Sequence, residues 1–379
     1  MLLNRLLERA RQLPLRTRLL RRRASLVQDR CPLVVVPSIL GTRLADQRGR
    51  MLWGSLRNLY SGSPVGDDPN VVTAGLLTGF NIVPGLLQYD VFGGLLRYLS
   101  RVGGYVPGED LHVLEYDWRT GIADAGQWLG ELLTQLRGAG QERFDLLCMS
   151  SGGLVARWLL SKWPAAVRRV VYVGTPQRGS VTAFWYLADG VQVAPLGKSF
   201  SGEAVARFQT VWDTLPHPED PAFVSETGEP LDLNLYDAGN WSRLGLDFPK
   251  MQDRLDAAAA LHHTIDGVEH ADSFAIGARD LPTVSRCIVK DGRATFPPCE
   301  PRPGDPRLRF AFEPGDSLVP ERSLGAGIDP SHVWHVHIDQ HRGLPAEPQV
   351  HRLALEALLA IGRTIPLTLL GRKPALTAG

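Results

Sequence analysis

A strand that turns directly into a helix through four small residues constrains this chain more than any other stretch. Residues 144–149 are an apolar run typical of a buried parallel strand. The small residues 150–153 follow, and then a helical spacing that places Leu154 and Trp158 on one side. A serine at the apex of such a corner is the pattern of a nucleophile elbow. The elbow exposes the serine hydroxyl and places the next amide at a helix N-terminus.

The residues that frame the corner favour Ser150 over Ser151 as the nucleophile. Strand and helix pack closely at an elbow, so the positions two before and two after the nucleophile must be small. Ser150 has Cys148 and Gly152 at these positions, whereas Ser151 would have Met149, which is too large. A serine that only caps the helix is the alternative, but a cap does not require small neighbours.

Length and charge limit the class of protein. A chain of 379 residues can build one large α/β domain with an insertion, or two domains. A net charge of +1 argues against a nucleic-acid partner, and no apolar run is long enough to span a membrane. Cys31 and Cys148 are expected to be buried thiols, and the spacing of Cys287 and Cys299 allows one disulfide.

Residues 1–30 form a basic arm with nine arginines against Glu8 and Asp29. The arm has no uninterrupted apolar core of the kind that a secretory signal needs, so we expect a cytoplasmic protein. Two interpretations of the arm remain. It is a solvated helix packed at the edge of the domain, which we favour, or it contacts an anionic membrane surface, which would make the protein peripheral to a membrane.

Strand and helix patterns alternate in a way that predicts a parallel sheet. The order strand, helix, strand around the elbow is typical of a right-handed βαβ unit. Helices are expected in the second half of 80–102, at 123–136 and at 349–361. The expected strands are 31–36, 111–116, 144–149, 169–174, 273–277, 308–312 and 333–338.

Two segments interrupt this alternation. Residues 49–79 lack periodicity and are rich in Gly, Pro, Asp and Asn, so they are interpreted as a lid loop in which Trp53 and Tyr60 could cover an apolar substrate. Residues 181–270 are turn-rich and carry the aromatic cluster 184–186, and we interpret them as a cap inserted over the site.

A serine hydroxyl needs a base to take its proton and an acid to orient that base. In elbow proteins of this kind the chain order is serine, acid, histidine, with the acid in a loop just past a strand. Asp316 follows the expected strand 308–312 and fits this position. Asp305 precedes that strand and Asp329 lies in a later turn, so both rank lower.

The base is expected between the last strand and the closing helix, where His341 lies. His332, His335 and His337 lie at or in the strand, and His351 lies in the helix. A metal cluster of the strand histidines is the alternative, but no set of carboxylates or cysteines accompanies them. We therefore expect neither a metal nor another cofactor.

The tight loop after strand 31–36 supplies the remaining part of such a site. The backbone amides of Ile39 and Ser151 are the expected donors to the oxyanion of a tetrahedral intermediate. One such donor contributes about 3 to 4 kcal/mol of transition-state stabilisation.

Five motifs in this order resemble the lecithin:cholesterol acyltransferase-like branch of the α/β-hydrolases, over roughly residues 31–363. Departures stand at Ser38, Cys148, Met149 and Ser317, and the lid lacks the paired cysteines of secreted members. The resemblance implies acyl transfer from a phospholipid or other lipid ester through an acyl-serine, with Ser150, Asp316 and His341 as the triad. The motifs are Pro37-Ser38-Ile39-Leu40-Gly41-Thr42-Arg43-Leu44, Tyr116-Asp117-Trp118-Arg119, the Ser150 elbow, Gly174-Thr175-Pro176-Gln177-Arg178-Gly179-Ser180 and Gly315-Asp316.

We therefore predict an α/β-hydrolase fold with a mostly parallel central sheet, flanking helices, an inserted cap and a lid loop. The predicted activity is that of a lipid acyl hydrolase or acyltransferase. An esterase, thioesterase or lactonase for smaller esters is the first alternative, and a non-catalytic binding protein of the same fold is the second. The predicted parts are the arm 1–30, core 31–180 with the lid 49–79, cap 181–270, core 271–365 and tail 366–379.

Overall fold

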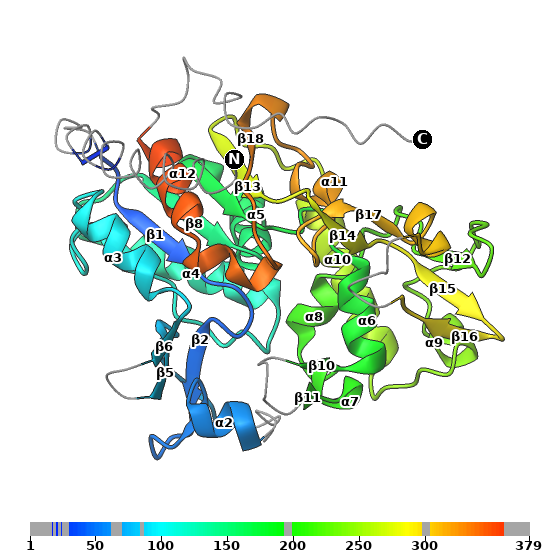
Figure 1. The fold of residues 1–379 in the computed structure, drawn as a ribbon. Helices are drawn as coiled ribbons and strands as arrows, with labels where there is room; N and C mark the ends of the chain where they lie inside the picture. The colour runs from blue at the N-terminus through cyan, green and yellow to red at the C-terminus, as the bar shows by residue number, and fades with distance from the viewer. Residues whose placement is uncertain are drawn as a thin grey trace.

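A six-stranded parallel sheet forms the centre of the computed structural model (Figure 1). The model describes residues 17, 20, 21, 24, 30–61, 70–83, 87–192, 199–297 and 304–359. Nearly all of the basic arm, the tail 366–379 and Cys299 therefore lie outside the described residues. The strands, in spatial order, are β18 (Val333–His335), β13 (Ser273–Gly277), β9 (Val167–Val173), β8 (Phe144–Met149), β1 (Leu33–Val36) and β7 (Leu111–Val113).

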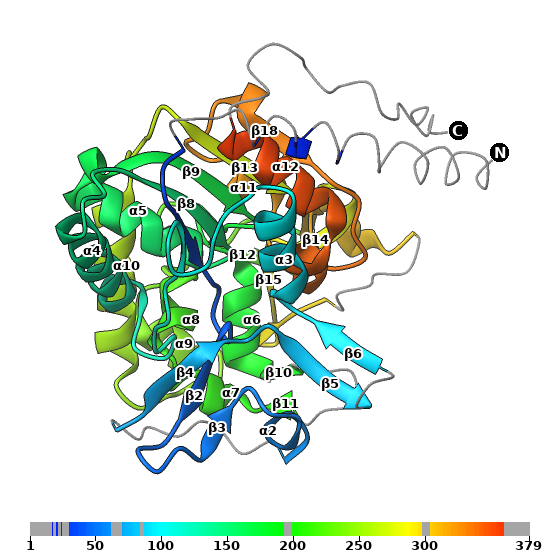
Figure 2. The same ribbon diagram turned by 90° about the vertical axis from the view of Figure 1, so that its left-hand side faces the viewer.

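The apolar runs of these strands are explained by burial on both faces of the sheet. Val34 and Cys148 belong to one hydrophobic cluster, and their chain neighbours Val35 and Met149 belong to the other. Successive strand residues point to opposite faces, so a sheet covered on both sides requires continuous apolar sequence. Helices α4 (Ile122–Gly138) and α5 (Gly152–Lys162) cover one face, and α3 (Gly93–Arg101) and α12 (Pro348–Leu358) cover the other (Figure 2).

The segment expected to be a lid loop contains regular structure instead. Strand β2 (Thr42–Ala45) pairs antiparallel with both β3 (Met51–Trp53) and β4 (Val72–Leu76), and α2 (Leu56–Ser61) follows β3. A hairpin of β5 (Gly79–Val83) and β6 (Leu87–Asp90) comes next. The expectation of an irregular loop was wrong because β3 and β4 have only three and five residues, too few for an alternating pattern to stand out in the sequence. The Tyr60 side chain lies outside what the structure describes.

Two further small sheets lie outside the central sheet, and one of them joins a strand that precedes β13 in the chain with strands that follow it. Strand β12 (Phe223–Ser225) pairs in parallel with β15 (Cys287–Lys290), which pairs antiparallel with β16 (Arg293–Thr295). A second pair is formed by β14 (Leu281–Val284) and β17 (Phe312–Gly315). The strand expected at 308–312 was misplaced, because residues Pro306–Arg309 form a 3-10 turn and β17 begins only at Phe312. The remaining elements are α6 (Val181–Asp189), β10 (Val191–Gln192), β11 (Ser199–Phe200), α7 (Gly202–Val205), α8 (Gln209–Asp213), α9 (Ala238–Arg243), α10 (Met251–Ile265) and α11 (Glu321–Leu324).

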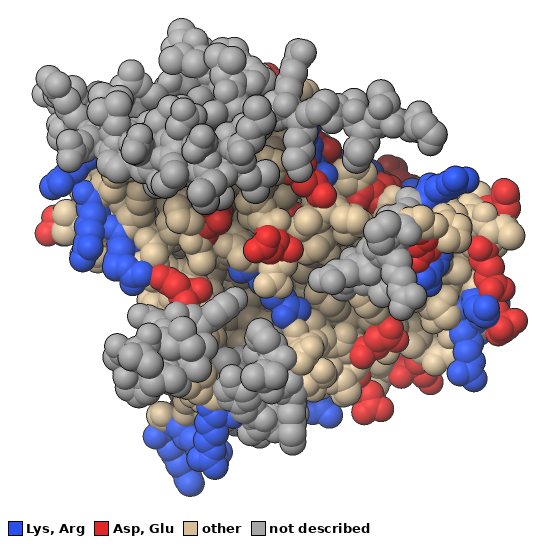
Figure 3. Space-filling model, in the orientation of Figure 1, with Lys and Arg blue, Asp and Glu red and all other residues tan. Residues whose placement is uncertain are grey.

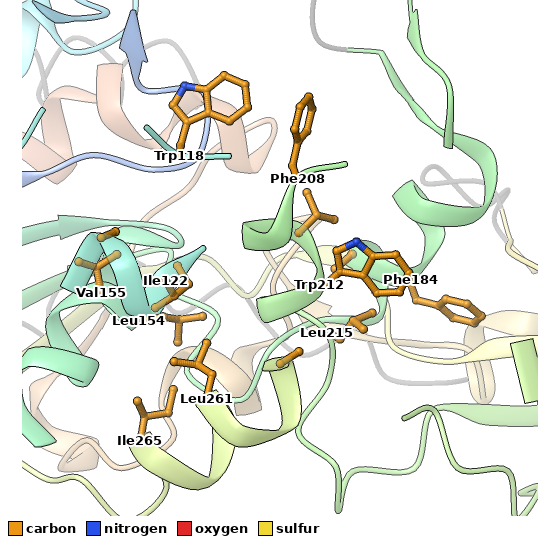
Figure 4. Packing of buried hydrophobic residues seen from close by; sticks show 14 of the residues in the cluster. Trp118, Ile122, Leu154, Val155, Phe184, Phe208, Trp212, Leu215, Leu261 and Ile265 are labelled. Atoms are coloured by element: carbon orange, nitrogen blue, oxygen red, sulfur yellow. The ribbon is translucent and has the colours of Figure 1, made fainter. Parts of the chain in front are cut away.

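Aromatic side chains pack within residues 181–270 and between these residues and the rest of the core. Phe184 is fully buried and packs edge-on against Trp241, with ring centroids 4.5 Å apart. Trp118 packs edge-on against Phe208 at 5.2 Å (Figure 4). Phe184 and Trp53 are thus core residues, and not exposed aromatics that are free to cover a substrate.

Charged side chains of both signs are spread over the face shown in Figure 3, with basic residues mainly on the left and acidic residues mainly on the right. No helix among the described residues is long and apolar enough to cross a membrane. Cys287 is a free, buried cysteine, as is Cys148, while the free Cys31 is half-buried. The spacing allowed a disulfide between Cys287 and Cys299, but Cys287 is a free cysteine in the structure.

Candidate active site

Ser150 sits at the corner between β8 and α5 with a backbone φ of 49°. This left-handed conformation is strained for a residue with a side chain, and such strain is common at functional positions. The Ser150 amide is held by the carbonyl of Val173 at 2.7 Å. The corner is therefore tied to the neighbouring strand β9.

The glycines after Ser150 are required by close packing. A Cβ atom on Gly152 would lie 2.5 Å from the carbonyl oxygen of Val36, and one on Gly153 would lie 2.2 Å from Oγ1 of Thr175. Cys148, two residues before Ser150, is fully buried, and burial raises the pKa of its thiol. A thiol in that state stays neutral, so Cys148 acts as a small core residue.

Three side chains from separate parts of the chain meet at the corner. Nε2 of His341 lies 3.0 Å from Oγ of Ser150, and Nδ1 of His341 lies 2.7 Å from Oδ2 of Asp316. A carboxylate only accepts, so Nδ1 carries the proton and Nε2 presents its lone pair to the serine hydroxyl. Asp316 and His341 are 1% and 7% exposed, so water competes little for these bonds.

The loop after β17 orients the acid. Oδ1 of Asp316 accepts hydrogen bonds from the amides of Leu318 at 3.1 Å and Val319 at 2.7 Å. Ser317, where the family pattern favours glycine, has a φ of 78°. Its hydroxyl accepts a bond from the amide of His341 at 3.3 Å, so it links the acid loop to the turn that carries the base.

The loop after β9, which holds the fourth motif, packs against the same group. Gly174 has a φ of 59°, and a Cβ there would lie 2.8 Å from Cε1 of His341. The hydroxyls of Ser180 and Thr182 both donate to the carbonyl of Leu318. This motif therefore leaves room for the imidazole ring and supports the acid loop.

The lower-ranked candidates have other partners. Asp305 pairs with Arg307 at 2.6 Å, and Asp329 accepts the amide of Ser331 at 2.8 Å at the start of a 3-10 turn. No group of three or more His, Cys, Asp or Glu residues in the described ranges could hold a metal ion. The other histidines are bound elsewhere, His332 to the carbonyl of Ser273, His335 to Glu321, His337 to Asp280 and His351 to the carbonyl of Pro345.

The two amides expected to line an oxyanion hole differ in their surroundings. The Ser151 amide lies at the N-terminus of α5, where an anion is stabilised. The Ile39 amide donates to the side-chain Oγ of Ser151 at 2.8 Å. Ser151 is 1% exposed, so this hydroxyl is shielded from water. In this structure the Ile39 amide is thus engaged by an internal acceptor.

Side chains from two other segments hold the oxyanion loop, residues 37–42. Oη of Tyr116 donates to the carbonyl of Pro37 at 2.9 Å, and Nε1 of Trp118 donates to that of Thr42 at 3.0 Å. Nε1 of Trp53, from strand β3, donates to the carbonyl of Leu40 at 2.8 Å. The sequence indicated no structural role for the second motif, 116–119. The hydrogen bonds from Tyr116 and Trp118 show that this motif holds the oxyanion loop in place.

Backbone hydrogen bonds add to these contacts. The amide of Gly41 donates to the carbonyl of Ser38 at 2.9 Å, which closes a turn, and the amide of Leu77 donates to the carbonyl of Gly41 at 2.8 Å. Leu40, within the turn, has a φ of 66°, a conformation that glycine adopts more easily. The loop keeps this strained form because neighbouring groups fix it on both sides.

The model of the lecithin:cholesterol acyltransferase family matches residues 80–264. No curated protein matches the chain in sequence.

Solved structures are similar at low identity. A chain in "The crystal structure of Tle4-Tli4 complex" is 13% identical, over 88% of this chain and 99% of that chain, with a TM-score of 0.58. The lipase BlEst2 of Bacillus licheniformis is 11% identical over 87% and 89%, with a TM-score of 0.40. EstA of Clostridium botulinum is 12% identical over 89% of both chains, with a TM-score of 0.38. The parallel sheet with the elbow at Ser150 is that of an α/β-hydrolase, and residues 80–264 of this chain are similar to the lecithin:cholesterol acyltransferase family.

Proposed function

We propose that this chain is a serine-dependent acyl hydrolase or O-acyltransferase that acts on phospholipids or other lipid esters through an acyl-serine. The observation that carries the proposal is the unbroken hydrogen-bonded series Ser150, His341, Asp316. A hydroxyl aligned with a neutral imidazole, and an imidazole aligned with a buried carboxylate, together form an activated nucleophile.

The reaction then has two halves. Oγ of Ser150 attacks the ester carbonyl while Nε2 of His341 takes its proton, and Asp316 stabilises the imidazolium. The tetrahedral intermediate collapses, the bond to the alkoxy group breaks, and His341 returns the proton to the leaving alcohol. Water or a second alcohol next attacks the acyl-serine, with His341 again as base, and Ser150 is released.

The oxyanion of each intermediate forms next to the Ser151 amide. The N-terminus of α5 favours negative charge there, and the loop 37–42 lies against it, because a Cβ on Gly152 would touch the carbonyl of Pro37 at 2.6 Å. We assign the amides of Ser151 and Ile39 as the two donors. To reach the oxyanion, the Ile39 amide must weaken or give up its bond to the Ser151 side chain.

The preference for lipid esters rests on the family, and one observation favours the alternative of smaller esters. Trp53 and Phe184 are in the core, so the apolar surface left near the site is smaller than the sequence implied. Half-buried Trp185 remains, stacked on Phe296 with centroids 6.0 Å apart.

Two measurements test the proposal. Intact mass after incubation with a fluorophosphonate should increase by one adduct in the wild-type protein and in Ser151→Ala, but not in Ser150→Ala. Hydrolysis of p-nitrophenyl esters of increasing chain length, and of dispersed phospholipid, then defines the substrate. Because each buried methylene contributes about 0.8 kcal/mol, kcat/KM should rise with chain length until the groove is full. A preference for acetate with no response to dispersed lipid would favour the small-ester alternative, and a labelled Ser150→Ala would refute the nucleophile.

A further inference from the structure

The side chain of Ser151 presents a conflict within the proposed oxyanion hole. Its backbone amide is one proposed donor, while its hydroxyl accepts the hydrogen bond of the other proposed donor, Ile39, at 2.8 Å. That distance is typical of a full-strength bond. A single amide proton that is committed to one acceptor has little left for a second, so the hydroxyl and the substrate oxyanion compete for the Ile39 amide.

The hydroxyl is well placed to keep this amide. Ser151 is almost fully buried, so water does not compete for its hydroxyl, and the loop that carries Ile39 is held by Tyr116, whose Oη donates to the carbonyl of Pro37 at 2.9 Å. The loop is therefore fixed at Pro37, two residues before Ile39. A hydrogen bond between two fixed groups that are shielded from water is stronger than one exposed to it, so the Ser151 oxygen holds the Ile39 amide firmly.

Two opposite effects follow from losing the hydroxyl. The loop 37–42 would lose one anchor, and the Ile39 amide would be freed for the oxyanion. The loop keeps other bonds, from Tyr116, Trp53 and Trp118 and from the backbone of Gly41 and Leu77. Several other bonds anchor the loop, whereas the Ser151 hydroxyl is the acceptor that the Ile39 amide has in this structure. Release of the amide is therefore the larger of the two effects.

We propose that the Ser151 hydroxyl is a built-in competitor for the Ile39 amide, which the substrate oxyanion must displace in the transition state. The inference rests on the proposed function. Ser151 acts here through Ile39, so its side chain is a positioning residue and not a catalytic one. The Ser151 hydroxyl keeps the Ile39 amide hydrogen-bonded while the site is empty. When substrate is bound, the same hydroxyl lowers kcat because it competes with the oxyanion.

The test compares turnover and labelling across four variants. Ser151→Ala should raise kcat on a soluble p-nitrophenyl ester about fivefold with KM unchanged, because one neutral hydrogen bond no longer opposes the transition state. The rate of fluorophosphonate labelling of Ser150 should rise by a similar factor, because the phosphonyl oxygen occupies the same hole. Ser151→Cys retains a weaker acceptor, so its kcat should lie between those of Ser and Ala.

Two tyrosine variants control for loss of buried hydrogen bonds. Tyr116→Phe leaves the Ser151 oxygen on Ile39, so its kcat should not rise. Tyr236→Phe is the matched control, because Oη of Tyr236 donates to the carbonyl of Pro216 at 2.7 Å and Tyr236 is also buried. It should lower the unfolding temperature and leave kcat as in the wild type.

The outcomes separate this inference from the proposed function. A folded Ser151→Ala protein with unchanged or lower kcat would overturn the competition, and would mean that the hydroxyl serves to anchor the loop. If Ser151→Ala does not fold, the direction of change in Ser151→Cys decides in the same way. A wild-type protein that neither turns over esters nor labels at Ser150 refutes the proposed function, whatever residue stands at 151.

Discussion

The carboxyl of Asp213 should make the stability of this protein fall as pH rises through the mildly acidic range. Asp213 ends α8 and is 3% exposed. Its Oδ2 accepts the amide of Ile122, the first residue of α4, at 2.7 Å, and its Oδ1 accepts Nε2 of Gln209 at 2.8 Å. A side chain from the predicted cap thus caps a helix of the core. The charge is favourable at a helix N-terminus but unfavourable in a buried position.

Burial is the larger effect and raises the pKa of Asp213 to about 6 from 3.8, although the two hydrogen bonds lower it. The folded chain therefore binds this proton more tightly than the unfolded chain. Stability from this group is complete below pH 4 and is lost as pH rises towards 6. The gap between the two pKa values corresponds to about 3 kcal/mol in the free energy of unfolding.

Asp213→Asn removes the titrating proton and keeps the shape of the side chain. The free energy of unfolding should be measured with urea for both proteins at pH 4 and at pH 7. The difference, variant minus wild type, should be about 3 kcal/mol more favourable at pH 7 than at pH 4. Asp305→Asn is a control of opposite sign, because hydrogen bonds from Arg307 lower the pKa of Asp305 to about 2. Its stability relative to the wild type should worsen as pH rises from 2 to 4. A difference for Asp213→Asn that does not change with pH would refute the reasoning.

Two further predictions concern the elbow and the histidines. Gly153→Ala should lower stability by about 1 to 3 kcal/mol in thermal unfolding, since the new methyl overlaps Thr175, and Thr175→Ala should restore part of the loss. Full stability of Gly153→Ala would show that the helix can move away from the sheet. His341→Ala should reduce kcat by about a thousandfold or more, while His335→Ala and His337→Ala should retain activity on the same ester. Comparable losses in all three histidine variants would point away from His341 as the base.

The sequence predicted the elbow and the parallel strands because both depend on local patterns. An apolar run followed by Ser150 and two glycines has few other uses, and the continuous apolar strands require two covered faces. The order of Ser150, Asp316 and His341 follows from the topology. The structure brings these three side chains within hydrogen-bonding distance, and their roles remain proposals.

The contacts that the sequence could not predict are those between a side chain and a distant backbone group. The bond from the Ile39 amide to the Ser151 hydroxyl and the bond from the Ile122 amide to the Asp213 carboxylate join segments more than 90 residues apart, in pairings that no periodicity encodes. The strands within 49–79 were missed for another reason. β3 has only three residues and ends just before Gly54, and β4 contains Gly75; both glycines have positive φ. The division into arm, core, lid, cap and tail stays a prediction.

The sheet of β12, β15 and β16 has a consequence for how this protein could be divided or redesigned. Its strands come from stretches of chain on either side of β13, which is an inner strand of the central sheet. The outlying region is thus one physical unit encoded in two separate blocks. Removing either block alone would expose an unpaired strand edge, which favours aggregation. A graft of this region onto another scaffold would therefore require both blocks and a matching central strand between them.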